Sequence, residues 1–282
     1  MSKGKMLRDY MKGGMVTAPF VNEGYGAKVA QSVGFKAIYM TGFGTAATYG
    51  IPDVGLLTYK EMVDKISHLT EACDLPIIAD ADTGYGNYSN VYRTVRGYER
   101  AGAAALHLED QVWPKRCGYM AGKQVVDRAE AVSKIKAAVD ARIDSDFIII
   151  ARTDALAVSG WEEVEERVGL FLEAGADMIF VDGIKSKEQL FEYGKRFGHL
   201  PCIINNVPLF PRKLIEETGN FNIQLHAGPF FFQLVEYMGR MKELAETGDC
   251  QATPDVFAKF NQIVEVMGAN FYFELENKYK KQ

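Results

Sequence analysis

Acidic residues follow two short apolar segments, and they are the first candidates for chemistry. Residues 80–87 read Asp-Ala-Asp-Thr-Gly-Tyr-Gly-Asn, and residues 107–110 read His-Leu-Glu-Asp. Carboxylates that converge without partners repel one another and raise one another's pKa, so they ordinarily require a cation. An all-oxygen ligand set with room for water suits Mg²⁺, with Mn²⁺ as the alternative ion, better than zinc. The sequence therefore predicts a metal site. In the alternative interpretation, Asp82 and Asp110 cap helices or pair with Lys115 and Arg116.

A second candidate is the segment 113–123, Trp-Pro-Lys-Arg-Cys-Gly-Tyr-Met-Ala-Gly-Lys, which follows the second acidic cluster. It is too long for a tight turn between a strand and a helix, and its glycines could act as hinges, so we predict a mobile lid. Two cations beside Cys117 are expected to lower the pKa of its thiol and to attract an anionic substrate. Cys117 is therefore a candidate catalytic thiol, although a loop cysteine without a chemical role fits the same pattern.

Two further segments could bind an anion. Arg152, in the run Ala-Arg-Thr-Asp at 151–154, could hold a carboxylate with its guanidinium, or it could form a structural salt bridge to Asp154 or Glu109. Residues 41–44, Thr-Gly-Phe-Gly, are expected to form a small-residue turn whose N–H groups could bind an anion.

These residues need a fold that brings them together. Short apolar runs alternate with longer segments of helical period, which predicts eight strands and eight helices. The predicted strands cover residues 15–18, 37–41, 76–80, 105–108, 147–152, 178–181, 201–205 and 222–225. The predicted helices cover residues 24–32, 59–72, 89–100, 128–141, 162–173, 187–196, 211–217 and 231–246. Left-handed C-caps are expected where a glycine follows a helix, at Gly34, Gly102, Gly175 and Gly219.

A βα unit repeated eight times is typical of a closed (β/α)8 TIM barrel. The chain has 282 residues without a Pro/Ser-rich linker. We predict one catalytic barrel domain over residues 1–247 and a C-terminal helical extension over residues 248–282, whose aromatic residues indicate a subunit contact. An open, doubly wound sheet is the alternative, but it would need a phosphate-binding turn after the first strand, and Ala-Pro-Phe at 18–20 is no such turn.

Composition excludes several classes of function. Lys+Arg 32 against Asp+Glu 37 gives a net charge of −5 without long runs of one sign, so no footprint for nucleic acid is present. The first residues lack the apolar core of a signal peptide, and no run of 18 apolar residues occurs, which predicts a soluble protein without a membrane partner. The four cysteines are widely spaced, which favours reduced thiols in the cytoplasm.

Several of these motifs, in this order, resemble the isocitrate lyase and phosphoenolpyruvate mutase superfamily, nearest its branch of methylisocitrate and dimethylmalate lyases and oxaloacetate hydrolases. The resemblance covers residues 7–241, and its most specific parts are residues 51–53, 80–87, 107–111 and 115–118. It implies a (β/α)8 barrel, usually tetrameric with the last barrel helix exchanged between subunits. It also implies Mg²⁺ and a 2-oxo or 2-hydroxy acid as the ligand.

The resemblance further implies roles for individual residues. Asp80 and Asp82 would hold the metal, with Glu109 acting directly or through water. Thr41, Gly42 and Phe43 would bind the oxo-acid carboxylate beside Arg152. The predicted catalytic residues are Tyr39, Asp53, Lys115, Cys117 and Arg152. The other predicted substrate-binding residues are Gly118, Tyr119, Asp182 and Asn205.

The sequence of the lid differs between superfamily members that catalyse different reactions. The members that cleave carbon–carbon bonds resemble this chain in a Lys-Arg-Cys-Gly or Lys-Lys-Cys-Gly lid, whereas the phosphonate mutases lack the cysteine. Removal of the substrate's hydroxyl proton would release a 2-oxo acid and an enolate, and Cys117 would protonate that enolate.

At four places this sequence differs from the motifs of the lyases it resembles, and these differences narrow the range of predicted substrates. Tyr119 stands where the lyases have histidine, Asp182 where a glutamate is usual, and the motif around Asn205 lacks its Thr-Glu. After the eighth strand, residues 226–232 carry three phenylalanines where tricarboxylate lyases carry an arginine. Without that arginine a third carboxylate would stay unpaired, which disfavours isocitrate and methylisocitrate.

We therefore predict a Mg²⁺-dependent lyase that splits a small 2-hydroxy dicarboxylate, of the 2,3-dimethylmalate or 2-methylisocitrate type, into pyruvate and a carboxylate. The first alternative is an oxaloacetate hydrolase or decarboxylase. A phosphonopyruvate mutase or hydrolase is a further alternative, which Cys117 disfavours. The alternative outside enzymes is a barrel that only binds an oxo acid or serves as an assembly scaffold.

Overall fold

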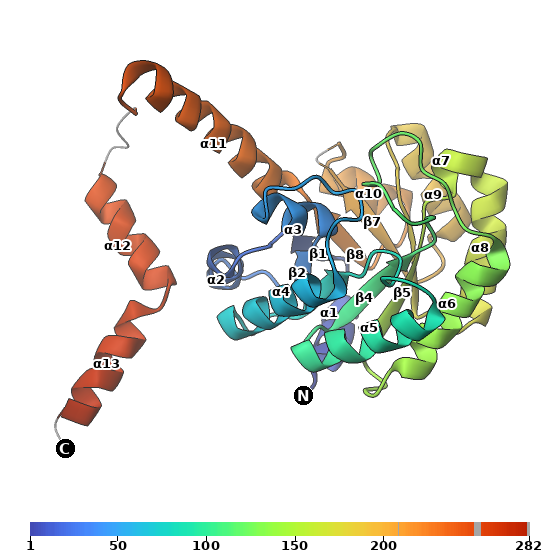
Figure 1. The fold of residues 1–282 in the computed structure, drawn as a ribbon, viewed down its shortest axis with the longest axis horizontal. Coiled ribbons are helices and arrows are strands. Elements are labelled where there is room, and N and C mark those ends of the chain that lie inside the picture. The colour runs from blue at the N-terminus through green and yellow to red at the C-terminus, as the bar shows by residue number, and fades with distance from the viewer. Residues whose placement is uncertain (208, 251–254, 281–282) are drawn as a thin grey trace.

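Eight parallel strands form a barrel that helices surround in the computed structural model, which describes residues 1–207, 209–250 and 255–280 (Figure 1). The strands are hydrogen-bonded in the order β1-β8-β7-β6-β5-β4-β3-β2. The N–H of Val21 donates to the carbonyl of Tyr39 at 2.9 Å, and Phe20 forms a parallel bridge with Tyr39, so the first and second strands also meet. The predicted TIM barrel is confirmed, and the doubly wound alternative is wrong.

Each predicted strand lies within one residue of its observed bounds. The strands are β1 (Val16–Pro19), β2 (Ile38–Met40), β3 (Ile77–Asp80), β4 (Ala105–Glu109), β5 (Ile148–Thr153), β6 (Met178–Val181), β7 (Cys202–Asn206) and β8 (Ile223–His226). Short, continuous apolar runs identified them because both faces of a barrel strand are buried.

The eight predicted helices are also present. They are α2 (Gly24–Ser32), α4 (Tyr59–Ala72), α5 (Tyr88–Ala101), α6 (Arg128–Ala141), α8 (Trp161–Glu173), α9 (Lys187–Phe197), α10 (Arg212–Thr218) and α11 (Gly228–Thr247). The structure adds α1 (Lys3–Met11), α3 (Gly42–Thr48), α7 (Leu156–Ser159), α12 (Val256–Val266) and α13 (Ala269–Lys280). Helix α1 buries Leu7 fully in the core inside the barrel, and its Tyr10 and Met11 pack against the same core.

Three of the four predicted glycine C-caps are confirmed. Gly34, Gly102 and Gly175 have φ of +89°, +99° and +94°. Gly219 is extended instead, with φ of −179°. A Cβ at Gly194 would lie 1.9 Å from the carbonyl oxygen of Thr218, so the chain ends of α9 and α10 pack backbone against backbone. A Cβ at Gly219 would in turn lie 2.9 Å from Gly194 Cα, so close packing of the two helices requires glycine at this position. The predicted left-handed turn at Gly219 is wrong.

The C-terminal helices leave the barrel. Figure 1 shows α11 projecting from it, with α12 and α13 lying apart from the strands. Only Gly228 of α11 is buried, and none of the residues of α12 and α13 is. Residues 251–254 and 281–282 of the predicted extension lie outside the described residues. The domain boundary after residue 247 stays a prediction. Among the described helices, none has the length and apolar character that a membrane crossing requires.

Candidate active site

A cavity of about 300 Å³ opens at the carboxyl ends of the strands, where a TIM barrel places its chemistry. All five predicted catalytic residues line it. Its lining consists of Phe20, Tyr39, Thr41, Phe43, Asp53, Asp80, Lys115, Cys117, Gly118, Tyr119, Met120, Arg152, Asp182, Asn205, Val207, Ala227, Phe230 and Phe231. Of the other predicted site residues, Gly42, Asp82 and Glu109 are buried behind this wall.

The predicted metal ligands differ in their electrostatics. Burial alone would raise the pKa of Asp80, but His107, Lys115 and Arg152 hold it below its usual range. Burial raises the pKa of Asp82 to about 6, although Lys115 opposes the shift. Burial also raises the pKa of Glu109 well above its usual range. The second and third carboxylates therefore hold protons more tightly than in water, as expected where anions are crowded together.

Asp82 also adopts a strained backbone conformation, with φ of +45°. The turn after β3 contains a second residue of this kind, Tyr85, with φ of +61°. The hydroxyl of the buried Tyr98 donates to the carbonyl of Asp80 at 3.0 Å, and its oxygen lies 2.8 Å from the hydroxyl of the half-buried Tyr85, so this tyrosine pair supports the turn. Strain supported in this way is typical of functional sites.

The side chains of Lys115 and Arg116 have different partners. The Lys115 ammonium lies 2.7 Å from Asp82 Oδ1 and forms an ion pair with Asp53, so the pairing expected as an alternative role for Asp82 is present. The Arg116 guanidinium points elsewhere and donates to the carbonyl of Ala121 at 2.8 Å. Of the two partners suggested for Asp82, Lys115 and Arg116, the structure pairs it with Lys115.

Asp110 does not join the acidic cluster. Its side chain accepts from Thr153 Oγ1 at 2.6 Å, from the N–H of Asp154 at 2.9 Å and from Arg167 Nη1 at 3.1 Å. Successive residues at a strand end point to opposite faces, so Glu109 and Asp110 diverge. Of the acidic residues singled out in the two motifs, Asp110 thus stays outside the cluster, and its suggested pair with Lys115 or Arg116 is wrong because Arg167 is its partner.

The remaining acidic groups fit a hydrated cation. Within the described chain, Glu109 Oε1 is buried and lacks a hydrogen-bond partner. The buried carboxylates in and behind the cavity wall are Asp53, Asp80, Asp82, Glu109, Asp154 and Asp182, and the buried cations among them are Lys115, Lys123 and Arg152. In the described ranges no three Asp, Glu, His or Cys side chains converge closely enough to hold one ion alone. Carboxylate oxygens are the ligand type that Mg²⁺ takes in proteins, usually together with several waters.

Cys117 lies in the cavity wall, but its ionisation differs from the expectation. Burial raises the pKa of its thiol to about 11, and Asp53 and Asp182 act in the same direction. The predicted lowering is wrong because the Lys115 ammonium faces Asp53 and Asp82, and the Arg116 guanidinium faces the lid backbone. The thiol is therefore protonated at neutral pH.

Arg152 pairs with more carboxylates than expected. Its Nε lies 3.0 Å from Asp154 Oδ2, and its Nη2 lies 3.1 Å from both Asp182 Oδ2 and Glu109 Oε2. The salt bridges considered as its alternative role are thus both present. Its contact with a substrate carboxylate stays a prediction, which its place in the cavity wall supports.

The segment 41–44 is not a simple turn. Thr41 is the N-cap of α3, which begins at Gly42. The N–H of Gly42 donates to Asp80 Oδ2 at 2.9 Å. This N–H therefore binds an anion, as the sequence suggested, but the anion is a carboxylate of the protein itself.

Sequence reasoning missed the residue that fixes this segment. Asn22 is 2% exposed, and its Oδ1 accepts from the N–H of Thr41 at 3.2 Å and from Thr45 Oγ1 at 3.3 Å. A Cβ at Gly44 would lie 1.9 Å from Asn22 Nδ2. A polar residue just beyond the end of β1 was the available signal.

The phenylalanines after β8 form part of one wall. Phe230 and Phe231 line the cavity, whereas Phe232 is 59% exposed and lies outside the lining. The expected apolar surface is therefore made by two of the three phenylalanines. Phe43 completes it, since its ring lies edge-on to that of Phe230 at 6.4 Å.

The family model described as phosphoenolpyruvate phosphomutase matches residues 7–224. The chain belongs to this family. The resemblance found in the motifs is confirmed, and the protein is an enzyme of the isocitrate lyase and phosphoenolpyruvate mutase superfamily.

Curated relatives include lyases. The chain is 40% identical over 271 residues to a 2,3-dimethylmalate lyase of Eubacterium barkeri, which covers 94% of this chain and 93% of the relative. It is 48% identical over 170 residues to a 2-methylisocitrate lyase of Vibrio cholerae, covering 60% of this chain and 55% of the relative. These relatives support a carbon–carbon lyase.

Solved structures include hydrolases of the same fold. An oxaloacetate acetylhydrolase bound to 3,3-difluorooxalacetate matches with a TM-score of 0.92 and 34% identity, covering 99% of this chain and 97% of that chain. A phosphonopyruvate hydrolase bound to oxalate and Mg²⁺ matches with a TM-score of 0.87 and 29% identity, covering 99% of each chain.

Proposed function

We propose that this enzyme cleaves a small 2-hydroxy dicarboxylate of the 2,3-dimethylmalate type into pyruvate and a monocarboxylate. The observation that carries the proposal is the protonated thiol of Cys117 in a cavity that combines carboxylate-binding groups with an apolar wall. The 2,3-dimethylmalate lyase relative supports it.

Each proton transfer in this cleavage can be attributed to a residue of the cavity. The Asp53 carboxylate would accept the substrate's hydroxyl proton, with Tyr39 beside it, and the bond between C2 and C3 would break to give the carbonyl of pyruvate. The electron pair stays on C3, next to a carboxylate, and the Cys117 thiol donates its proton there. After the thiol has protonated C3, the proton held by Asp53 would return to the Cys117 thiolate through water. A thiol whose pKa burial has raised to about 11 is loaded with that proton at neutral pH.

A divalent cation is part of the proposal. Asp80 would hold it from the cavity wall, and Asp82 and Glu109 would hold its bound waters. When bound, Mg²⁺ or Mn²⁺ supplies positive charge for the oxygens of the oxo acid. Arg152 and the N–H of Phe43, at the start of α3, would orient the carboxylate of the same ligand beside Thr41.

The apolar wall favours an alkyl substituent. Phe43, Phe230 and Phe231 face the space for the second fragment, to which Gly118, Tyr119, Asp182 and Asn205 would add polar contacts. Burying a methyl group against phenylalanine is favourable, whereas a third carboxylate would lose water without gaining an arginine. Methylisocitrate is therefore the less favoured substrate.

A substrate comparison tests this activity. With Mg²⁺, 2,3-dimethylmalate should be split into equal amounts of pyruvate and propionate, and its kcat/KM should exceed that of methylisocitrate by at least about tenfold. Coupled pyruvate detection and chromatography of propionate measure both products. Turnover of oxaloacetate alone, with formation of oxalate and acetate, would instead establish the hydrolase that the oxaloacetate acetylhydrolase structure supports.

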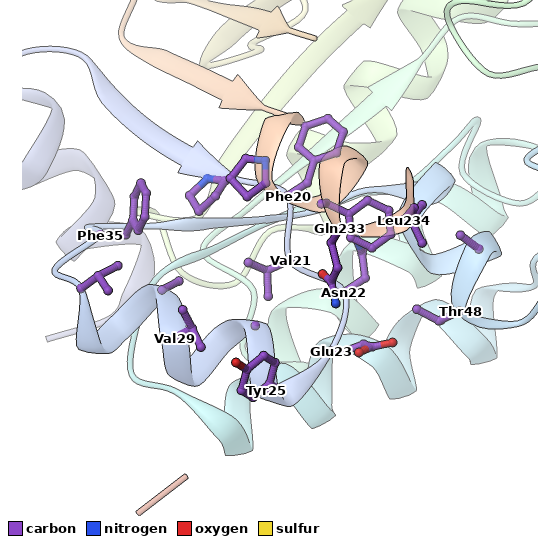
Figure 2. A pocket seen from close by; sticks show the side chains of 17 residues that line it. Phe20, Val21, Asn22, Glu23, Tyr25, Val29, Phe35, Thr48, Gln233 and Leu234 are labelled. Carbon is purple, nitrogen blue, oxygen red and sulfur yellow. The ribbon is translucent and has the colours of Figure 1, made fainter. Parts of the chain in front are cut away.

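We also propose a homotetramer in which α11 is exchanged between subunits. A groove of about 250 Å³ lies between β1, α2, α3 and the first turns of α11. Figure 2 shows Val21, Val29 and Phe35 along it, with Leu234 of α11 at one end. Since α11 itself projects away from the barrel, a partner's helix has room to cover this groove (Figure 1).

A variant of α11 tests the assembly. Light scattering of the full chain should give the mass of a tetramer. Replacing the exposed Met238 by glutamate should reduce that mass, because it would bury a charge in the exchanged contact. Glu236→Ala, at an exposed residue on the opposite face of the same helix, is the control and should leave the mass unchanged. A monomeric wild-type protein would contradict the exchange.

The proposed location is the cytoplasm. All four cysteines, Cys73, Cys117, Cys202 and Cys250, are free thiols. Reduced thiols are the usual state of cysteine in that compartment.

A further inference from the structure

Lys123 is a buried cation that the proposed reaction does not use, and it lies where the lid rejoins the barrel. The N–H of Val112 donates to the carbonyl of Gln124 at 2.8 Å, and Gln111 and Val125 form an antiparallel bridge. These contacts close the base of the lid, residues 113–123. Lys123 is the last residue of the lid, so its backbone is fixed beside that base.

The Lys123 side chain connects this base to the tip of the lid, residues 117–119. Its ammonium donates to the carbonyl of Gly118 at 2.7 Å and to Asp154 Oδ1 at 2.6 Å. The side chain is 2% exposed. Gly118 directly follows Cys117, so this bond fixes the backbone next to the proposed acid.

Asp154 has a counter-ion without Lys123. Arg152 Nε and Nη2 lie 3.0 Å and 3.2 Å from its two carboxylate oxygens. Burying an ammonium group is costly. The Lys123 ammonium also lies 3.9 Å from Asp182 Oδ2, so it adds positive charge to this cluster. Its bond to the Gly118 carbonyl is the contact that reaches the lid.

The tip of the lid also rests directly on the ion pair in the cavity wall. A Cβ at Gly118 would lie 1.6 Å from Asp182 Oδ2 and 3.0 Å from Arg152 Nη2. The lid backbone therefore touches two residues predicted to bind the substrate, in a space that admits only glycine. A shift of the tip would move the thiol relative to these groups.

We propose that Lys123 is a positioning residue that holds the tip of the lid over the cavity by binding the Gly118 carbonyl against Asp154. Its effect on catalysis acts through Cys117 and rests on the proposed function, since it takes Cys117 as the acid. Its effect on the position of the lid is independent of the reaction.

Alkylation of Cys117 by iodoacetamide tests the position of the lid without turnover. In full-length Lys123→Met, the Cys117 peptide should be labelled at least about tenfold faster than in the wild type, because an open lid exposes a thiol whose pKa burial holds at about 11 instead of 9.0. The exposed Cys250 serves as the internal reference and should react at an unchanged rate. Lys187→Met, at an exposed lysine, is the matched control and should match the wild type.

Kinetics and a second pair of variants separate positioning from stability. Lys123→Met should lower kcat about tenfold or more with a smaller change in KM, and Lys123→Arg should restore most of both properties. Lys123→Leu, a smaller apolar side chain that cannot hydrogen-bond to the Gly118 carbonyl, keeps the test valid if the methionine variant does not fold. Wild-type labelling rates in folded Lys123→Met or Lys123→Leu would overturn the proposal. Faster labelling in a protein that cleaves no 2-hydroxy dicarboxylate would uphold the lid role while refuting the proposed function.

Discussion

Replacing Cys117 by serine is expected to lower kcat for carbon–carbon cleavage about 10³-fold and to leave KM within about threefold. A hydroxyl has nearly the shape of the thiol, so binding should persist, but it is a much weaker acid toward carbon. The thiol is suited to the transfer because burial keeps it protonated while it lines the cavity. Steady-state kinetics with the preferred dicarboxylate measure both constants.

The controls for Cys117→Ser use the other cysteines of the chain. Cys250→Ser changes an exposed thiol far along the sequence and should leave kcat unchanged. Full cleavage activity in folded Cys117→Ser would exclude this thiol as the acid.

The strands and helices could be predicted because their signals are local. Continuous apolar runs identified β1 to β8, and Gly102 and Gly175 ended helices as expected. Gly219 shows the limit of this reasoning. Glycine is required there by close contact with Gly194, 25 positions earlier, and not by the conformation of its own turn. A single sequence does not reveal such long-range packing.

Most residues that line the candidate cavity could be predicted, but their protonation could not. The strand ends indicated where Asp80, Glu109 and Arg152 would meet, and all of them are buried there. The pKa of Cys117 was predicted in the wrong direction because sequence neighbours were counted as spatial neighbours. Lys115 adjoins the thiol in sequence but pairs with Asp53 and Asp82 in space, and burial then dominates.

Removing the proposed metal ligand Asp80 should have an effect as large as removing the thiol. Asp80→Asn is expected to lower activity at least about 100-fold and to raise the Mg²⁺ concentration needed for half-maximal activity. Asparagine keeps an oxygen for the N–H of Gly42 but loses the charge of the one predicted ligand that reaches the cavity. A chelator should abolish wild-type activity, and Mg²⁺ or Mn²⁺ should restore it.

Thermal unfolding, which needs no turnover, tests whether the loss of activity in Asp80→Asn comes from lost Mg²⁺ binding. Mg²⁺ should raise the melting temperature of the wild type, since a ligand that binds only the folded state stabilises it, and it should have little effect on Asp80→Asn. Asp110→Asn is the matched control, because this neighbour of Glu109 bonds to Thr153 and Arg167 outside the cavity. It should cost stability yet keep the Mg²⁺ response. An equal Mg²⁺ response in Asp80→Asn and the wild type would show that the buried carboxylates bind their cation elsewhere, or none at all.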